Sequence, residues 1–441
     1  MSRIIQRSLK SVPDTVVGGD GIRLHLANGQ IVIDGSGGAA VACIGHGNKR
    51  VAAAMAEQAG RVAYAHTGFF TSEPAEALAD ILLADEPGGL THAFFVSSGS
   101  EAMEAAIKLA RQYHAEKGEP GRINFIGRRL SYHGTTLGAL AVGGHVARRT
   151  PYEPLLSPAF SKVSPCFPYH YQAPDESDAQ YVARLEAELE AECQRLGPDT
   201  VAAFCAETVV GAATGCVTAV PGYFAAMRAV CDRHGALLIL DEVMCGMGRT
   251  GTLHAWEQEG VAPDIQAVAK GLGGGYAPIG GILVSGRVMA ALREGTGGFM
   301  HGQTYQAHPV ACAAALEVQR ILREEALVPR VTVAGDTLER LLTERFGNHA
   351  HVGDIRGRGL FRALEFVVDR PQRTAFAPSA AIAERVKQAA LDRGLGVYPC
   401  TGTQDGHVGD HIIVAPPYIA SDDDLGAIVR RLGDAVDAVF A

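Results

Sequence analysis

Thr91-His-Ala-Phe-Phe-Val-Ser-Ser-Gly-Ser-Glu-Ala-Met-Glu-Ala-Ala-Ile-Lys-Leu-Ala-Arg111 is the stretch that decides the fold. Its first residues form an apolar run typical of a strand, and a helical pattern begins after Gly99 and Ser100. The two are joined by a polar, glycine-containing turn, not by a two-residue hairpin, which favours a parallel sheet. The stretch therefore predicts one strand–helix unit of an α/β protein.

The same alternation continues along most of the chain. Further strands are expected over Arg122–Ile126, Val201–Ala206, Ala236–Leu240 and Ile265–Ala269. Helical patterns cover Glu101–Lys117 and Tyr181–Leu196. Alternating elements of this kind predict a mostly parallel, doubly wound sheet.

The length and a change of texture predict two domains. A chain of 441 residues exceeds the size at which single cores usually stop growing. After about residue 320, helical patterns (Val331–Arg345, Ser379–Leu391, Ser421–Phe440) surround one strand-like run, Leu360–Val368. We predict a large domain over residues 66–320 and a smaller α+β domain formed by residues 1–65 and 321–441.

Composition excludes several classes of function. The formal net charge of −9 argues against nucleic acid or anionic membranes as partners, since both require a basic face. The pairs Arg128–Arg129, Arg148–Arg149 and Arg430–Arg431 are scattered, and we expect them on the solvated surface. No apolar window predicts a membrane span or a signal peptide, so we expect a cytoplasmic protein. The nine cysteines lack CxxC spacing, which favours buried reduced thiols over disulfides or a metal site.

The turn after the first strand is a candidate phosphate site. A helix beginning at this turn exposes unpaired N–H groups and the positive end of its dipole. Gly99 would let a phosphate approach the backbone, and the Ser100 hydroxyl could donate to it. The alternative is that Ser98 or Ser100 only caps the helix.

Two more residues follow apolar runs at the ends of expected strands. Asp241 could hold a protonated pyridine nitrogen, although a turn or cap residue is the alternative. Lys270 precedes the glycine-rich Gly271–Gly275 and could form a Schiff base if its pKa is depressed. A lysine that simply ends a strand in water is the alternative. The glycine runs at 246–251 and 271–275 lack the partners of nucleotide-binding loops.

The order of these motifs resembles that of the class III aminotransferases, which depend on pyridoxal 5′-phosphate (PLP). The resemblance runs from about residue 20 to the C-terminus. It rests on Ser97–Arg111, Tyr132-His-Gly134, Asp241-Glu-Val243, Gly248-Arg-Thr-Gly251, Ala269-Lys-Gly-Leu-Gly273, Gln303-Thr304 with Pro309, and Arg356-Gly-Arg-Gly359. Within the family, the chain is similar to the ω-amine/aspartate aminotransferase-like branch.

This resemblance implies a fold type I enzyme, normally a homodimer or a dimer of dimers with shared active sites. Lys270 matches the Schiff-base lysine and general base, and Asp241 matches the partner of the pyridine nitrogen. The remaining cofactor-binding positions implied are Ser98, Gly99, Ser100, Tyr132, His133, Gly134, Glu207, Val243, Met244 and Thr304. Tyr132 matches the aromatic on one ring face and Val243 the residue under the other, while Thr304 matches the residue that reaches the neighbouring subunit's phosphate.

The sequence departs from its relatives at positions that bear on the substrate. Met244 stands where many relatives carry glutamine, and Thr208 where proline is common. Family members that bind a substrate carboxylate often use an arginine before the Pro-Pro pair, but Gly396–Pro417 contains none. Carboxylate recognition must then come from elsewhere, with Arg148 and Arg149 as candidates, or the donor lacks an α-carboxylate.

We expect the enzyme to move an amino group from an amine or ω-amino acid to a 2-oxo acid such as pyruvate or 2-oxoglutarate, in a ping-pong sequence. An isomerase, epimerase or decarboxylase of the same family would use the same lysine. A non-catalytic PLP-binding protein is the third alternative, which the absence of an attached DNA-binding segment disfavours.

Overall fold

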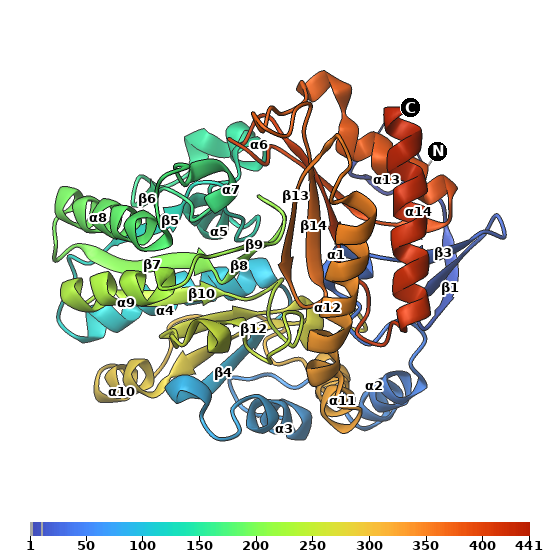
Figure 1. The fold of residues 1–441 in the computed structure, drawn as a ribbon. Coiled ribbons are helices and arrows are strands. Elements are labelled where there is room, and N and C mark those ends of the chain that lie inside the picture. The colour runs from blue at the N-terminus through green and yellow to red at the C-terminus, as the bar shows by residue number, and fades with distance from the viewer. Residues whose placement is uncertain (1–2, 10–11) are drawn as a thin grey trace.

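The computed structural model describes residues 3–9 and 12–441 of the chain (Figure 1). A seven-stranded sheet forms its centre. The strand order is β4 (Leu90–Val96), β12 (Gly280–Ser285), β11 (Ile265–Val268), β10 (Leu237–Asp241), β7 (Val201–Glu207), β5 (Asn124–Arg128) and β6 (Phe160–Val163). Strand β12 is antiparallel to both neighbours, and the other neighbouring pairs are parallel. The prediction of a mostly parallel sheet is confirmed.

The five strands expected from the sequence correspond to β4, β5, β7, β10 and β11, with ends shifted by one or two residues. The sequence reasoning missed β6 and β12. Strand β12 begins with Gly280 and Gly281 shortly after Pro278, a composition more typical of a turn than of a central strand. Its fully buried Ile-Leu-Val run was the signal that could have revealed it.

Helices cover both faces of the sheet, as a doubly wound fold requires. On one face, α4 (Gly99–Glu116) and α10 (Gly286–Glu294) share a core with alternate residues of the strands. On the other face, α3 (Glu73–Leu82), α8 (Asp178–Leu196), α9 (Tyr223–His234) and α11 (Pro309–Glu324) form a second core with the intervening residues. This alternation follows from the strand repeat, in which successive side chains point to opposite faces.

A smaller group of elements lies beside the main sheet. Strands β13 (Val352–Arg358), β14 (Phe361–Phe366), β17 (Asp410–Val414) and β16 (Tyr398–Thr401) form an antiparallel sheet. It shares a core with α12 (Leu327–Phe346), α13 (Ile382–Asp392) and α14 (Asp422–Phe440). The helices expected over 331–345, 379–391 and 421–440 correspond to these three, although α13 starts later because Pro378–Ala380 forms a separate 3-10 turn.

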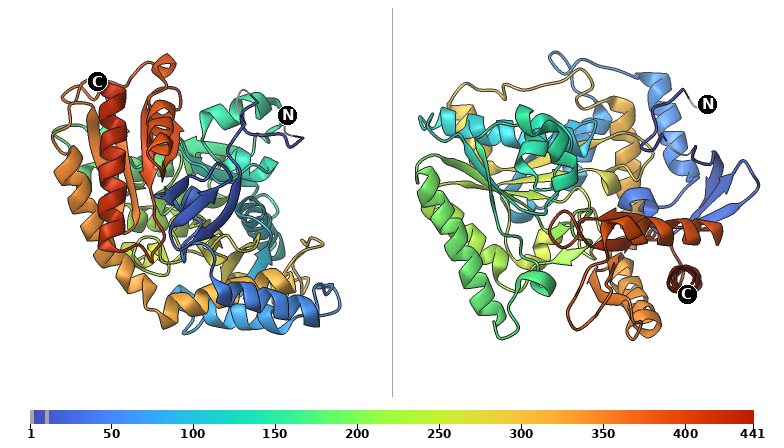
Figure 2. Two further views of the ribbon diagram at one scale, coloured as in Figure 1. Left: turned by 90° about the vertical axis from the view of Figure 1, so that its right-hand side faces the viewer. Right: turned by 90° about the horizontal axis from the view of Figure 1, so that it is seen from above.

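The N-terminal strands join this smaller group. Strands β1 (Val16–Asp20), β2 (Arg23–Leu26) and β3 (Ile31–Asp34) form a sheet completed by β15 (Leu395–Gly396), which pairs in parallel with β3. Figure 2 shows the N-terminal strands beside the C-terminal elements. The division into residues 66–320 and residues 1–65 plus 321–441 stays a prediction, which this pairing supports.

The remaining elements are short or connect these layers. They are α1 (Gly37–Ala40), α2 (Lys49–Arg61), α5 (Leu137–Val142), α6 (Val146–Arg149), α7 (Pro168–Tyr171), β8 (Val209–Val210) and β9 (Val217–Thr218). Within residues 3–9 and 12–441, each helix is too short or too polar to cross a bilayer.

Candidate active site

A cavity of about 470 Å³ opens at the carboxyl ends of the central strands. Ligands of open α/β sheets bind at this edge. The cavity is lined by all but one of the predicted site residues: Ser98, Gly99, Ser100, Tyr132, His133, Gly134, Glu207, Asp241, Val243, Met244 and Lys270. The exception is Thr304, which is exposed and does not line the cavity.

The N-terminus of α4 forms one end of the cavity. Ser98 is its N-cap, with its hydroxyl accepting a hydrogen bond from the Glu101 amide at 3.2 Å, and it also lines the cavity. The Ser100 hydroxyl accepts a hydrogen bond from the Thr135 amide at 3.0 Å. Gly134 has φ +137° and lies so close that a Cβ would sit 2.6 Å from Ser100 Oγ. Only glycine fits this approach, which brings two loops together at a helix N-terminus.

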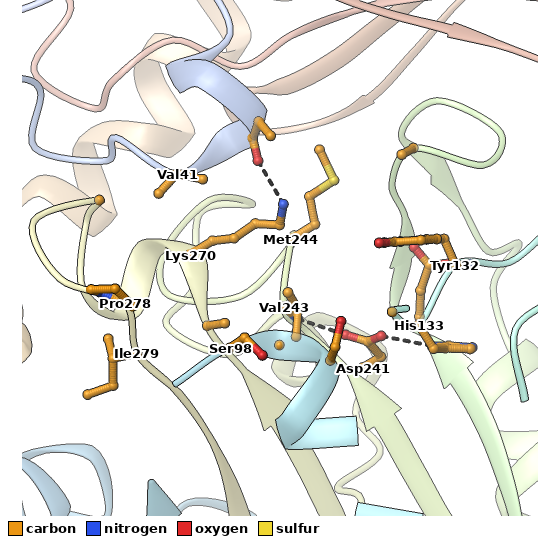
Figure 3. A pocket seen from close by; sticks show the side chains of 18 of the residues that line it. Val41, Ser98, Tyr132, His133, Asp241, Val243, Met244, Lys270, Pro278 and Ile279 are labelled. Atoms are coloured by element: carbon orange, nitrogen blue, oxygen red, sulfur yellow. Dashed lines mark hydrogen bonds and ion pairs between the residues drawn. The ribbon is translucent and has the colours of Figure 1, made fainter. Parts of the chain in front are cut away.

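Asp241 ends strand β10 and is 4% exposed. Its Oδ2 lies 2.8 Å from Nδ1 of the buried His133, and its Oδ1 accepts a hydrogen bond from the Val243 amide at 2.9 Å. Figure 3 shows both contacts at the base of the cavity. A buried carboxylate held by two donors has a fixed direction and keeps a negative charge available to a cationic ligand group.

Glu207 lies next to Asp241, because the two residues are paired in the register of the parallel strands β7 and β10. Its carboxylate accepts hydrogen bonds from the amides of Tyr132 at 3.0 Å and Gly211 at 2.8 Å. Burial raises the pKa of Glu207, and the neighbouring Asp241 raises it further. Glu207 thus anchors the loop that carries Tyr132 and His133.

Lys270 follows β11 and points into the cavity opposite Tyr132 (Figure 3). Its Nζ donates a hydrogen bond to the Ala39 carbonyl at 3.1 Å. Burial lowers the pKa of Lys270 from 10.5 to about 8, with Asp241 opposing that shift and Arg7 and Arg148 adding to it. Its backbone has φ 44°, a left-handed conformation that is uncommon for residues other than glycine.

Sequence reasoning missed the N-terminal wall of the cavity. Arg7, Ala39 and Val41 line it together with Tyr398 from strand β16. The first three residues lie at least 200 positions from both Asp241 and Lys270 in the sequence. Tyr398 lies more than 100 positions from either. No local pattern marks them, and only the packing of the smaller sheet against the central one brings them there.

The two neighbouring arginines proposed for carboxylate recognition differ in their surroundings. Arg148 lines the cavity, and its guanidinium carbon lies 4.8 Å from the centre of the Tyr132 ring. Arg149 faces away: it donates to the carbonyls of Leu140, Ala141 and Gly143 and pairs with Glu153 at 3.0 Å. Arg149 is therefore a structural residue in this fold.

The expectation that the arginine pairs lie on the solvated surface was wrong for Arg128. This residue is 1% exposed and donates a hydrogen bond to the Glu207 carbonyl at 2.6 Å. The guanidinium lies 5.8 Å from the ring centre of Tyr223, which is also buried. A buried arginine with carbonyl and aromatic partners is tolerated because its charge is shared over hydrogen bonds and a ring face.

Comparison with known proteins agrees with this geometry. The family model described as Aminotransferase class-III matches residues 4–436. The chain belongs to the class III aminotransferases. An uncharacterized aminotransferase of Schizosaccharomyces pombe is 49% identical to this aminotransferase over 429 residues, covering 97% of this chain and 94% of the relative.

Two solved structures show the same fold. The aminotransferase is 38% identical to an (S)-enantioselective ω-transaminase from Thermomicrobium roseum, with a TM-score of 0.92 over 98% of this chain and 94% of that one. It is 30% identical to an ω-transaminase from Pseudomonas jessenii solved in complex with PMP, with a TM-score of 0.91 over 97% and 93% of the two chains. The fold is accordingly fold type I, and the aminotransferase depends on PLP.

The residues of the cavity fit PLP in shape and in charge. A Cβ on Gly99 would sit 2.7 Å from Val243 Cγ1, so glycine is needed for the start of α4 to lie against the valine side chain. The helix N-terminus suits a phosphate, the Asp241 carboxylate suits a protonated ring nitrogen, and the Lys270 amine suits an aldehyde. These three groups converge on one cavity.

Proposed function

We propose that this aminotransferase moves an amino group from an amine or ω-amino acid to a 2-oxo acid, with PLP held covalently on Lys270. The observation that carries the proposal is the buried amine of Lys270, whose pKa is lowered to about 8, in the same cavity as the doubly hydrogen-bonded Asp241. The ω-transaminases among the structural neighbours support an amine or ω-amino acid as donor. Pyruvate and 2-oxoglutarate are the acceptors that we expect.

PLP supplies an electrophilic carbonyl for the amine and a ring that withdraws electrons from the reacting carbon. The chain's own residues do the rest. Asp241 holds the ring nitrogen in its protonated form, and His133 fixes the direction of that carboxylate. The Lys270 amine would act as base and acid for the proton that moves at the substrate carbon.

The remaining predicted residues position the cofactor in this proposal. Ser98, Gly99, Ser100 and Gly134 would form the phosphate end, at the N-terminus of α4. Tyr132 and Val243 both line the cavity and would cover the two faces of the ring. Met244 places an apolar thioether in the cavity near the end of the Lys270 side chain (Figure 3).

We further propose that the working form is a homodimer, or a dimer of dimers, in which Thr304 reaches the phosphate bound by the neighbouring subunit. Large apolar side chains are exposed in the segments 62–70 and 300–305: Val62, Tyr64, Phe69, Phe70, Met300 and Tyr305. Contact between the rings of Tyr64 and Tyr305, 6.2 Å apart, joins the two segments into one patch. A patch of this kind on a folded chain marks a protein interface. Sedimentation equilibrium tests the proposal, and a monomer at working concentration would contradict it.

Spectra of the purified holoenzyme test the reaction. Each amine is added alone, and loss of the cofactor's visible band without an oxo acid, followed by its return when an oxo acid is added, is the expected result. Turnover of substrate without any oxo acid would instead point to an isomerase, epimerase or decarboxylase. A visible band that no amine changes would point to a non-catalytic PLP-binding protein.

A further inference from the structure

We propose that Arg7 and Arg148 form a subsite for the substrate's carboxylate, so that the preferred substrates carry an anionic group joined to the amine by an apolar chain. This inference rests on the proposed function and adds to it the chemistry that selects the donor. It assigns the recognition of the carboxylate to two arginines that lie far apart in the sequence, and the sequence alone does not reveal Arg7.

The charge distribution in the cavity supports this subsite. Apart from Lys270, the lysine and arginine residues that line the cavity in the described part of the chain are Arg7 and Arg148. Both lie near enough to Lys270 for their positive charges to lower its pKa. An anion between the arginines would therefore lie within reach of an amine that reacts at the position of Lys270.

The surroundings of the Arg148 guanidinium also support the carboxylate subsite. Arg148 is partly buried and stacks on Tyr132, whose face holds the guanidinium without consuming its hydrogen-bond donors. Among the ion pairs of the described residues, Arg148 has no carboxylate partner, whereas the adjacent Arg149 pairs with Glu153. A planar guanidinium held by stacking and facing a cavity is suited to a bidentate carboxylate.

Arg7 approaches from the other wall. Its side chain hydrogen-bonds the hydroxyl of Tyr398, whose pKa is nonetheless raised because burial outweighs this contact. Arg148 also lowers the pKa of Tyr398, which places the phenol within the electrostatic reach of both arginines. The Tyr398 hydroxyl therefore lies near both the Arg7 and the Arg148 side chains.

Part of the cavity lining is apolar. Ala39, Val41, Val209 and Met244 contribute aliphatic or thioether groups to the lining. The C-terminal segment Gly396–Pro417 contains neither lysine nor arginine that could serve the carboxylate instead. An ω-amino acid has an amine for the Lys270 end of the cavity, a methylene chain for the apolar lining and a carboxylate for the two arginines.

The test compares pairs of donors that differ only in the carboxylate. Each ω-amino acid of a homologous series is measured against the n-alkylamine in which a methyl group replaces the carboxylate. The variants are Arg148→Gln and Arg7→Gln. Arg3→Gln is the matched control, because Arg3 is an exposed arginine of the same N-terminal segment that does not line the cavity.

Each cavity variant should lower kcat/KM for the ω-amino acids about 10- to 100-fold more than for the matched alkylamines, the range expected for a lost charge-assisted hydrogen bond. The control should change neither. The effects of the two substitutions should be less than additive if both side chains hold one carboxylate. An equal loss for both kinds of donor, or no loss for either, would overturn the subsite.

A binding measurement separates this inference from the proposed function. Glutarate, which has no amine to transfer, is titrated into the holoenzyme by calorimetry. Its Kd should rise at least about tenfold in Arg148→Gln and stay unchanged in Arg3→Gln. Absence of glutarate binding to the wild type, or equal affinity in all variants, overturns the subsite even if transamination is observed. Weakened binding in Arg148→Gln supports it even if no amine is converted.

Discussion

The imidazole of His133 lies 2.8 Å from the Asp241 carboxylate, with Nδ1 facing Oδ2. Both side chains are buried, His133 at 3% and Asp241 at 4% exposure. His133 lies in the loop after β5, and Asp241 ends β10. The contact therefore joins the Tyr132-His-Gly134 motif to the Asp241-Glu-Val243 motif. In this arrangement His133 is a positioning residue that acts on the cofactor through Asp241.

Replacing His133 should weaken catalysis through the direction of the Asp241 carboxylate. In His133→Ala, one donor to a buried carboxylate is lost, which costs about 1.5–3 kcal/mol and corresponds to a loss of about 10- to 100-fold in kcat or in PLP affinity. His133→Asn can restore a donor near the same position and should recover part of the loss. Single-turnover rates and cofactor titrations measure both quantities.

The control for this variant is His25→Ala. His25 also pairs with an aspartate, Asp20, at 2.8 Å, but both side chains are exposed. Exposed pairs contribute little, so kcat and PLP affinity should be unchanged. If His133→Ala matched this control in rate, spectrum and cofactor affinity, the positioning role would be wrong.

Among residues 3–9 and 12–441, two lysines have a strongly lowered pKa, and only one of them should bind the cofactor. Burial lowers the pKa of Lys162 to about 7, yet its Nζ donates to the Ala141 and Ser161 carbonyls and does not line the cavity. Lys270→Ala should therefore remove the covalent cofactor and reduce turnover by at least about 100-fold, the lower range for lost general acid–base catalysis. Lys162→Met should keep both. Borohydride reduction followed by peptide mapping identifies the modified lysine, and a label on Lys162 would contradict the assignment.

Much of the site could be predicted from the sequence because its parts follow strands. Ser98, Asp241 and Lys270 each come directly after an apolar run, and the carboxyl ends of β4, β10 and β11 meet at one edge of the sheet. Residues that follow these parallel strands are therefore far apart in the sequence but close together in the structure. The roles of these residues as cofactor ligands remain predictions that the variants above test.

What the sequence did not reveal depends on contacts between distant parts of the chain. Arg7 and Ala39 reach the cavity only because the N-terminal segment packs beside the central sheet. The prediction that Arg128 lies on the solvated surface rested on its charge alone and was wrong. An arginine is usually solvated unless buried partners such as the Glu207 carbonyl hold it. Strand β12 was not predicted because it begins with two glycines, and glycine is uncommon in strands.

Thr208, which replaces the proline common in relatives, should contribute to stability and not to catalysis. Its hydroxyl donates to Glu242 Oε1 at 2.8 Å, and burial raises the pKa of Glu242 to about 7. Thr208→Val leaves this buried carboxyl with one donor fewer and should lower the free energy of unfolding by about 1–3 kcal/mol. Denaturant unfolding of the cofactor-free protein measures it. Thr401→Val, at an exposed strand position, is the control, and an equal effect in both variants would contradict the role.

The capture of PLP by the cofactor-free enzyme should depend on pH through the Lys270 amine. Only the neutral amine reacts, and burial lowers its pKa from 10.5 to about 8, so the rate should rise with pH up to about 8 and then level off. Below that pH, each unit should reduce the rate about tenfold, since the neutral fraction falls in that proportion. Stopped-flow absorbance after mixing with PLP measures the profile.

The same experiment on Arg148→Gln tests the effect of the Arg148 charge on the pKa of Lys270. Because the Arg148 cation lowers the pKa of Lys270, its removal should raise that pKa and move the capture profile to higher pH. Arg3→Gln should leave the profile in place, since Arg3 does not line the cavity. A wild-type profile that still rises near pH 10.5 would mean that Lys270 titrates as a solvated lysine, and its burial would then not prepare it to react.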